Sequence, residues 1–361
     1  MTTASPAATR PASWDYSAPW GARAYVTDLS GPVHWIEFAP KIPETPKIPE
    51  TPKVPETPQA PDQTQDQSPD QDRDPGQQPP IVFVHGLGGS HLNWCLLGPQ
   101  LAAGRRAVAL DLRGFGLTPG LRVNSTVQAN ARLLDRFIRE VVATPAILVG
   151  NSMGGLISIL ETAANPDVIK GVVLIDPALP LPPRKPDWQV SGQFMLYALP
   201  GLGEHAVAKL MRTVSPETAV QQLLELCFAD PSRADPELIK ADVALLARRH
   251  PATRAQASAR ARIFLAAARS LLRVLSRRQR YAGMMAGIDV PVLLIGGEED
   301  RLVPVAAMRQ AAARNPHWES VILAGVGHTP QLEVPDAVTG AIQDWLARTE
   351  GSTNHAATDR T

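Results

Sequence analysis

The sequence predicts an α/β protein in which a mostly parallel sheet is flanked by helices and carries a helical insertion. Short apolar runs rich in β-branched residues recur along the chain, and helical patterns separate several of them. Strands that alternate with helices predict a parallel sheet with helices on both faces. The alternation stops between Ile175 and Val292, where helical patterns and proline-rich connectors replace it without a convincing strand.

Seven segments, each four to six residues long, are expected to form the strands. Apolar runs of this length, bounded by turn residues, are typical of strands buried on both faces. In chain order they are Val33–Phe38, Ile81–Val84, Ala107–Leu112, Ala146–Val149, Gly171–Ile175, Val292–Ile295 and Ser320–Leu323. Helical patterns between them include Thr126–Val142 and Ala306–Arg314.

These elements divide the chain into a core, two insertions and two ends. The core is expected at residues 25–39 with 81–177, and again at 288–348, and the helical insertion at 178–287. The flexible ends are expected at residues 1–24 and 349–361.

The other insertion, residues 40–80, is rich in proline and holds twelve of the 35 prolines. From Pro40 to Pro61 every third residue is proline, which matches the three residues per turn of a polyproline II helix. We interpret the segment as a surface insertion in a loop, without a part in catalysis. A docking strip at 40–61 for a proline-recognising partner is the alternative.

The composition favours a cytoplasmic protein with a sizeable core. The chain has 361 residues, is 44% hydrophobic, and carries 35 basic and 35 acidic residues, so its net charge does not indicate nucleic acid. The two cysteines, Cys95 and Cys227, fit a reducing compartment and have no metal-ligand spacing. No apolar segment resembles a signal peptide or a membrane span.

The stretch from Ala146 to Leu156 joins an expected strand to an expected helix through Gly150-Asn151-Ser152-Met153-Gly154. A serine hydroxyl is a weak nucleophile that must be held exposed beside a base. A sharp strand-to-helix turn exposes it, and the close approach of the chain explains the two glycines. An ordinary turn with an incidental serine remains the alternative reading of the motif alone.

A histidine base and an acid have candidates after later strands. His328 follows the last expected strand in a glycine-rich loop, where its imidazole can turn toward the serine. Asp300 ends the acidic run Glu298-Glu299-Asp300 after Val292–Ile295, and Asp176 competes with it because it also follows a strand.

The chain order of Ser152, an acid after a later strand and then His328 resembles that of the α/β-hydrolase superfamily. The run His85-Gly86-Leu87-Gly88 resembles the family's oxyanion loop, and Asp111-Leu112-Arg113-Gly114 resembles a structural loop after the next strand. The resemblance covers about residues 26–39 and 81–347.

The resemblance implies roles for several residues. Asp300 is favoured as the acid, with Asp176 as the alternative, and the backbone N–H groups of Leu87 and Met153 are expected to bind the oxyanion. Dehalogenases and epoxide hydrolases of this fold carry aspartate at the nucleophile position, so Ser152 indicates acyl transfer instead. The family's chemistry requires no metal and no organic cofactor, and the insertion matches its helical cap.

The expected cap contains ten arginines between Arg248 and Arg280 and no acidic residue from Val243 to Ile288. A solvated, partly paired helix face is the first interpretation, with Arg262, Arg269, Arg273 and Arg280 on that face. Weak contact with anionic lipid, or steering of an acidic substrate, is the alternative. Trp94 is a candidate pocket residue or, alternatively, a core tryptophan.

We therefore expect a cytoplasmic serine hydrolase that cleaves a small carboxylic ester or thioester with an apolar acyl part. Carbon–carbon bond hydrolysis and cofactor-free peroxidation use the same side chains and stay open, since chemistry is set by the pocket. A ligand-sensing protein that keeps the fold without catalysis is the third alternative. Oligomeric state, acyl length and leaving group have no signature in the sequence.

Overall fold

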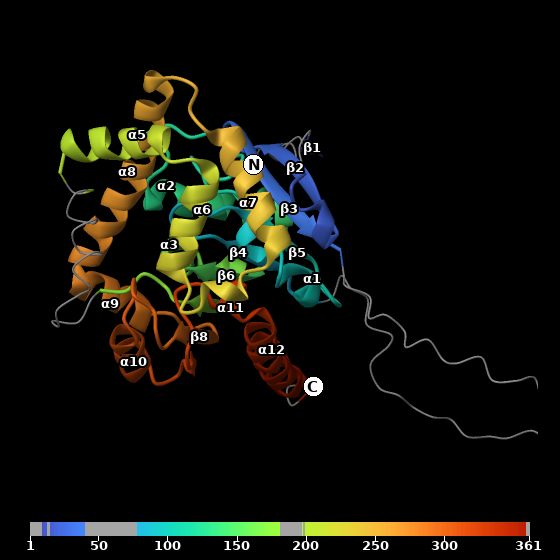
Figure 1. The fold of residues 1–361 in the computed structure, drawn as a ribbon. Helices are drawn as coiled ribbons and strands as arrows, with labels where there is room; N and C mark the ends of the chain where they lie inside the picture. The colour runs from blue at the N-terminus through green and yellow to red at the C-terminus, as the bar shows by residue number, and fades with distance from the viewer. Residues whose placement is uncertain (1–8, 13–14, 40–77, 181–196, 198, 359–361) are drawn as a thin grey trace, which may run out of the picture.

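The computed structural model describes residues 9–12, 15–39, 78–180, 197 and 199–358 (Figure 1). Their strands form one sheet in the order β1-β2-β3-β5-β4-β6-β7-β8-β9. The strands are β1 (Thr9–Pro11), β2 (Ala22–Asp28), β3 (Pro32–Phe38), β4 (Ile81–Val84), β5 (Ala107–Leu110), β6 (Ala146–Asn151), β7 (Ile169–Ile175), β8 (Val292–Gly297) and β9 (Glu319–Leu323). The strands from β5 to β9 are parallel, while β1, β2 and β3 join antiparallel. The predicted fold class is confirmed.

Helices cover both faces of the sheet, and alternate strand residues face opposite layers. Val82 and Val84 pack into one core with α2 (Val127–Phe137), α3 (Met153–Ala164) and α10 (Val305–Arg314). Ile81 and Phe83 pack into the other, which includes α1 (Gly98–Leu101) and α12 (Pro335–Thr358). The helix expected at 126–142 ends its α-helical part at Phe137 and finishes as a π-turn over Ile138–Val142.

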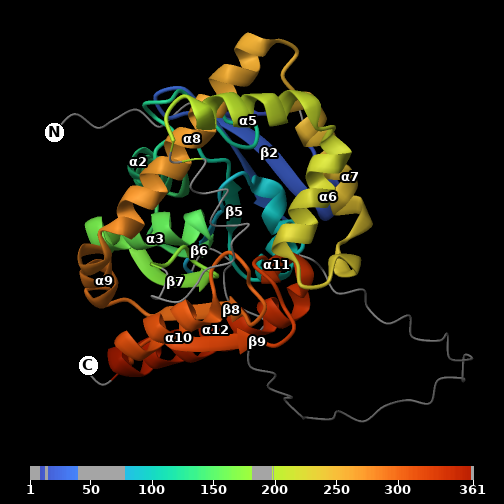
Figure 2. The ribbon, with the colours of Figure 1, turned by 60° about the vertical axis from the view of Figure 1, so that its left-hand side comes forward.

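The segment between β7 and β8 is helical where it is described. Its helices are α5 (Leu202–Thr213), α6 (Pro216–Cys227), α7 (Pro236–Arg249), α8 (Arg254–Ser276) and α9 (Arg278–Ala286). Small residues on α8, among them Ala257 and Ala261, let α5 approach closely and share a separate apolar cluster with Tyr197 and Val207. Figure 2 shows α5 to α8 grouped around one end of the sheet, while α10 and α12 lie at another.

Both expected flexible ends are shorter than predicted. Within residues 1–24, β1 and the start of β2 are ordered strands, because β2 pairs along its whole length with β3. Within 349–361, α12 continues to Thr358, and Glu350 on it binds Arg105 through two hydrogen bonds of 2.7 and 3.1 Å. Charge-assisted bidentate pairs of this kind fix a helix end to the body.

Residues 40–77 lie outside the described part of the chain, so the proline-rich segment and its docking strip stay a prediction. In the part that is described, no helix combines the length and the apolar character needed to cross a membrane.

Candidate active site

Ser152 occupies the junction between β6 and α3 in a strained backbone conformation. Its φ of 54° and ψ of −118° lie where side-chain-bearing residues are rare, and such outliers concentrate at functional sites. The turn brings Gly150 against the Gly154 carbonyl, only 2.7 Å from where a Cβ on Gly150 would lie. A Cβ on Gly154 would collide with the Val84 carbonyl oxygen, so the second residue of α3 has to be glycine. Ser152 is partly exposed.

His328 and Asp300 form the hydrogen bond that a base and its orienting acid require. Nδ1 of His328 lies 2.7 Å from Oδ2 of Asp300, and the Asp300 side chain is fully buried. The other oxygen, Oδ1, accepts hydrogen bonds from the N–H groups of Leu302 and Val303 at 2.7 and 3.0 Å. In a neutral imidazole, a proton on Nδ1 that is donated to Asp300 leaves Nε2 as the acceptor nitrogen.

Asn151 joins the serine turn to the histidine loop, and Gly86 brings the loop after β4 beside the serine; the sequence motifs assigned no role to the Asn151 side chain. The Asn151 amide donates to the carbonyl oxygens of Ile175 at 3.0 Å and of His328 at 3.1 Å. A Cβ on Gly86 would lie 3.1 Å from the Ser152 Cβ. The approach of Gly86 places the loop that begins Gly86-Leu87 directly beside the serine.

The expected oxyanion donors flank Ser152 on both sides of this contact. Met153 is the first residue of α3, where an N–H has no partner within the helix. Leu87 follows Gly86 in the adjoining loop. Neither N–H donates a hydrogen bond within the described residues. Their role as an oxyanion hole stays a prediction.

Asp176, the alternative acid, is fully buried next to Asp300 and is not bonded to His328. Its two oxygens accept hydrogen bonds from Gly297 N–H, each at 3.1 Å. Burial raises the pKa of Asp176 well above its usual range, and the neighbouring Asp300 raises it further. Of the two acids, Asp300 and not Asp176 contacts the imidazole of His328.

Trp94 is a core residue, in agreement with the second of its two interpretations. It ends a short 3-10 helix, His91–Trp94, and its side chain is fully buried. Its ring stacks on Phe83 with centroids 5.0 Å apart. The turn after β4 carries this tryptophan back beneath the sheet, in the layer that contains α1 and α12.

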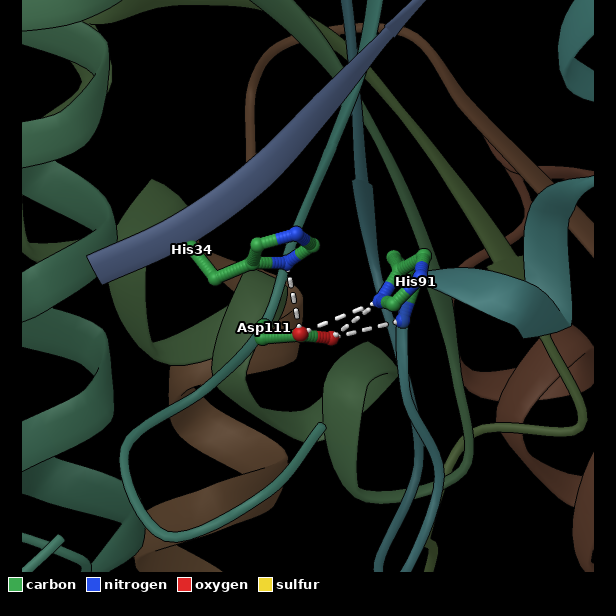
Figure 3. A group of neighbouring side chains, drawn as sticks. All are labelled: His34, His91 and Asp111. Atoms are coloured by element: carbon green, nitrogen blue, oxygen red, sulfur yellow. Dashed lines mark hydrogen bonds and ion pairs between the residues drawn. The ribbon is translucent and has the colours of Figure 1, made fainter. Parts of the chain in front are cut away.

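Among the described residues, one group has the composition of a metal site: His34, His91 and Asp111. Figure 3 shows the two imidazoles on either side of the carboxylate. Both Nδ1 atoms already bond to Asp111, at 2.8 and 3.0 Å, and the N–H groups of His91 and Leu117 donate to it as well. Burial raises the pKa of Asp111, but the charges and hydrogen bonds of His91 and His34 hold it well below its usual range. The cluster is consistent with a hydrogen-bonded support for the loop after β5.

Glu333, on the short helix α11 (Pro330–Glu333), is a further residue that the motifs did not indicate. Its buried carboxylate accepts hydrogen bonds from the N–H groups of Gly327, Ala229 and Asp230, at 2.8 to 3.1 Å. Since Gly327 precedes His328 and Ala229 follows α6, Glu333 joins the histidine loop to the helical insertion.

The arginine-rich stretch is divided between two helices. Arg280 lies on α9 and not on α8, so the expected single face of four arginines was wrong. Arg269 on α8 forms a bidentate ion pair with Glu204, at 2.6 and 3.1 Å, in agreement with a partly paired surface.

Comparison with known proteins agrees with this geometry. The sequence model of the Alpha/beta hydrolase family matches residues 81–341. The chain is 31% identical over 281 residues to a pimeloyl-acyl-carrier protein methyl ester esterase of Xanthomonas oryzae pv. oryzae, covering 75% of this chain and 96% of that protein. It is 26% identical over 273 residues to a 2-hydroxy-6-oxononadienedioate/2-hydroxy-6-oxononatrienedioate hydrolase of Cupriavidus pinatubonensis, covering 74% and 86%. Its fold is similar to that of the haloalkane dehalogenase DatA of Agrobacterium tumefaciens, with a TM-score of 0.65, 20% identity, and coverage of 91% and 97%.

Proposed function

The chain belongs to the alpha/beta hydrolase family, and from this premise we propose that it is a serine hydrolase of carboxylic esters or thioesters with an apolar acyl part. The observation that carries the proposal is the 2.7 Å contact of Asp300 with His328 Nδ1, in a loop bonded to the residue before Ser152. A serine hydroxyl needs such a base, whereas a carboxylate nucleophile attacks without one. Similarity to a methyl ester esterase over 75% of the chain supports the ester as substrate.

In the proposed reaction, Ser152 Oγ attacks the carbonyl carbon while its proton passes to His328 Nε2. The N–H groups of Leu87 and Met153 stabilise the negative oxygen of the tetrahedral intermediate. The intermediate collapses as His328 returns the proton to the leaving alcohol or thiol, and the acyl group stays on Ser152. Water then gives a proton to His328 as it attacks the acyl carbon, and His328 passes that proton to Ser152 Oγ as the acyl–oxygen bond breaks and the acid is released. These steps use no metal or organic cofactor.

We further propose that the helical insertion acts as a cap over the acyl pocket. It contacts both sides of the site. Phe264 of α8 lies 3.9 Å from the Cβ position of Gly88, next to Leu87, and the Cys227 carbonyl at the end of α6 accepts from His328 N–H at 2.6 Å.

Carbon–carbon bond hydrolysis is the second candidate, because a relative that is 26% identical has the name of a 2-hydroxy-6-oxo-dienedioate hydrolase. The same three side chains serve this chemistry when the pocket accepts a diketone instead of an ester. Product analysis with both substrate types separates the two candidates.

Labelling with a fluorophosphonate probe tests the nucleophile. The wild type and Ser276→Ala, which removes an exposed hydroxyl on α8, are expected to react, and Ser152→Ala is expected to remain unlabelled. A p-nitrophenyl ester series then measures acyl-length preference. Equal labelling of Ser152→Ala and the wild type would refute the assignment.

A further inference from the structure

A cavity of about 710 Å³ lies apart from the proposed catalytic residues, and neither Ser152 nor His328 lines it. Its walls come from the antiparallel edge of the sheet, the loop after β5, and the helices α7 and α8. Four of its lining residues are arginines: Arg10 on β1, Arg248 and Arg249 at the end of α7, and Arg260 on α8. Within the described part of the chain, no aspartate or glutamate lines it.

Arg249 and Arg260 are like charges placed together without a carboxylate in the cavity. Burial lowers the pKa of Arg249 to about 10, and repulsion from Arg260 contributes, while Asp111 opposes the change. Burial also lowers the pKa of Arg260. Arg249 donates to the Gly114 carbonyl at 2.7 Å, but neither arginine forms an ion pair with a described residue. Partly buried cations that repel each other are stabilised when an anion lies between them.

His34 lines the same cavity and has a buried ring nitrogen without a partner. Its Nδ1 bonds to Asp111 at 2.8 Å, which fixes the ring (Figure 3). The residue is 2% exposed, and its Nε2 has no hydrogen-bond partner. Buried polar atoms without partners are uncommon in folded proteins, so an unmade bond beside a cavity points to a missing ligand. Nε2 of a neutral imidazole can accept a hydrogen bond from the hydroxyl of a phosphate or carboxylic acid group, and Nε2 of an imidazolium can donate one to an anion.

We propose that this cavity binds a small molecule through an oxyanion group, either a phosphate or a carboxylate. The planar guanidinium group donates two parallel, charge-assisted hydrogen bonds to two oxygens of a carboxylate or of a phosphate. Arg260 belongs to the insertion and Arg10 to the sheet edge, so an anion held between them would join the two parts of the molecule. The site is separate from the proposed active site, and its occupation does not depend on the reaction assigned to Ser152.

Calorimetric titration of the full chain tests the proposal with inorganic phosphate and with succinate as probes. Sodium chloride at equal ionic strength corrects for screening. The decisive variant is Arg260→Met, which keeps most of the apolar stem, and its matched control is Arg262→Met. Arg262 is exposed on the same helix, outside the cavity lining, and its loss changes the net charge equally. A titration of fluorophosphonate-labelled protein shows whether the anion competes with the Ser152 site.

Saturable one-to-one binding of either probe is expected, and the preferred probe identifies the group. Loss of a charge-assisted contact is expected to weaken binding about tenfold in Arg260→Met and to leave Arg262→Met within about twofold. Without anions, Arg260→Met is expected to melt no lower than the wild type, because the repulsion of Arg249 is relieved. The proposal is overturned if neither probe saturates, if both variants weaken binding equally, or if labelling of Ser152 abolishes binding.

Discussion

Replacing each of the two buried carboxyl groups by its amide distinguishes the acid that orients His328 from the acid behind it. In Asp300→Asn, the amide oxygen is expected to take the place of Oδ1, which accepts from Leu302 and Val303 N–H. The NH₂ group then faces His328 Nδ1 across the former 2.7 Å contact. A donor at that position moves the imidazole proton to Nε2, so Nε2 can no longer act as the base proposed for Ser152.

The wrong tautomer costs about 10⁴ in kcat where a serine–histidine–aspartate triad is known, equivalent to about 5 kcal/mol in the barrier. We expect a loss of that size in Asp300→Asn. In Asp176→Asn, the amide oxygen still accepts from Gly297 N–H, and the NH₂ group donates to Asp300 as the protonated carboxyl does. The loss of kcat in Asp176→Asn is therefore expected to stay within about tenfold.

The assay is single-turnover acylation by a p-nitrophenyl ester, with the concentration of folded sites taken from circular dichroism. A stability measurement accompanies it. Because the folded pKa of Asp176 is raised, the wild type loses stability as pH rises through the unfolded pKa of about 3.9. Asp176→Asn should therefore be more stable than the wild type at pH 7, with a gain that shrinks toward pH 3. A kcat loss in Asp176→Asn equal to that in Asp300→Asn would refute this division of roles.

Two further predictions concern the support of the site. His85 donates and accepts through its two ring nitrogens, with Gly86 O at 2.8 Å and Leu112 N at 3.0 Å, and burial lowers its pKa from 6.5 to about 4. As the pH falls, His85 is therefore protonated in the unfolded state before it is protonated in the folded state. The free energy of unfolding should fall by about 3 kcal/mol from pH 6.5 to pH 4. Urea denaturation across that range should show a smaller fall in His85→Gln. Trp94→Ala should lower the free energy of unfolding by about 3 to 5 kcal/mol and leave the acyl-length preference in the ester series unchanged. An altered preference would indicate that Trp94 lines the acyl pocket.

The central parallel strands β4 to β8 were predictable because they are apolar runs buried along nearly their whole length. The two outer strands of the antiparallel edge, β1 and β2, were not, since β2 mixes apolar, polar and charged residues without a regular alternation over Ala22–Asp28. A signal was nevertheless present in the turn that follows it. Asp28 accepts from Gly31 N–H at 2.8 Å, and Ser30 and Gly31 both have positive φ, the backbone that Ser-Gly favours in a hairpin.

The candidate site was predictable where a residue is fixed by local backbone geometry. Ser152 needs its two glycines, and His328 lies in a loop whose Gly327 has no room for a side chain beside the Cys227 carbonyl. The strand pattern alone did not distinguish Asp300 from Asp176, because both follow parallel strands. The structure distinguishes them, since the Asp300 carboxylate is the one that lies within hydrogen-bond distance of His328 Nδ1. Asn151 and Glu333 act through tertiary hydrogen bonds that leave no periodic pattern in the sequence.

Those tertiary bonds determine how the insertion relates to the chemistry. At the end of α6 the contact is polar and buried, with Glu333 accepting from Gly327 and Ala229 and the Cys227 carbonyl accepting from His328. At α8 the contact with the loop of Gly88 is apolar, with Phe264 near that glycine and Leu87 packed against the cluster that includes Ala261 and Leu265. Polar bonds lose much of their energy when displaced by an ångström, whereas an apolar surface can slide. Adaptation to acyl groups of different size is therefore expected from α8, while α6 keeps the position of the base.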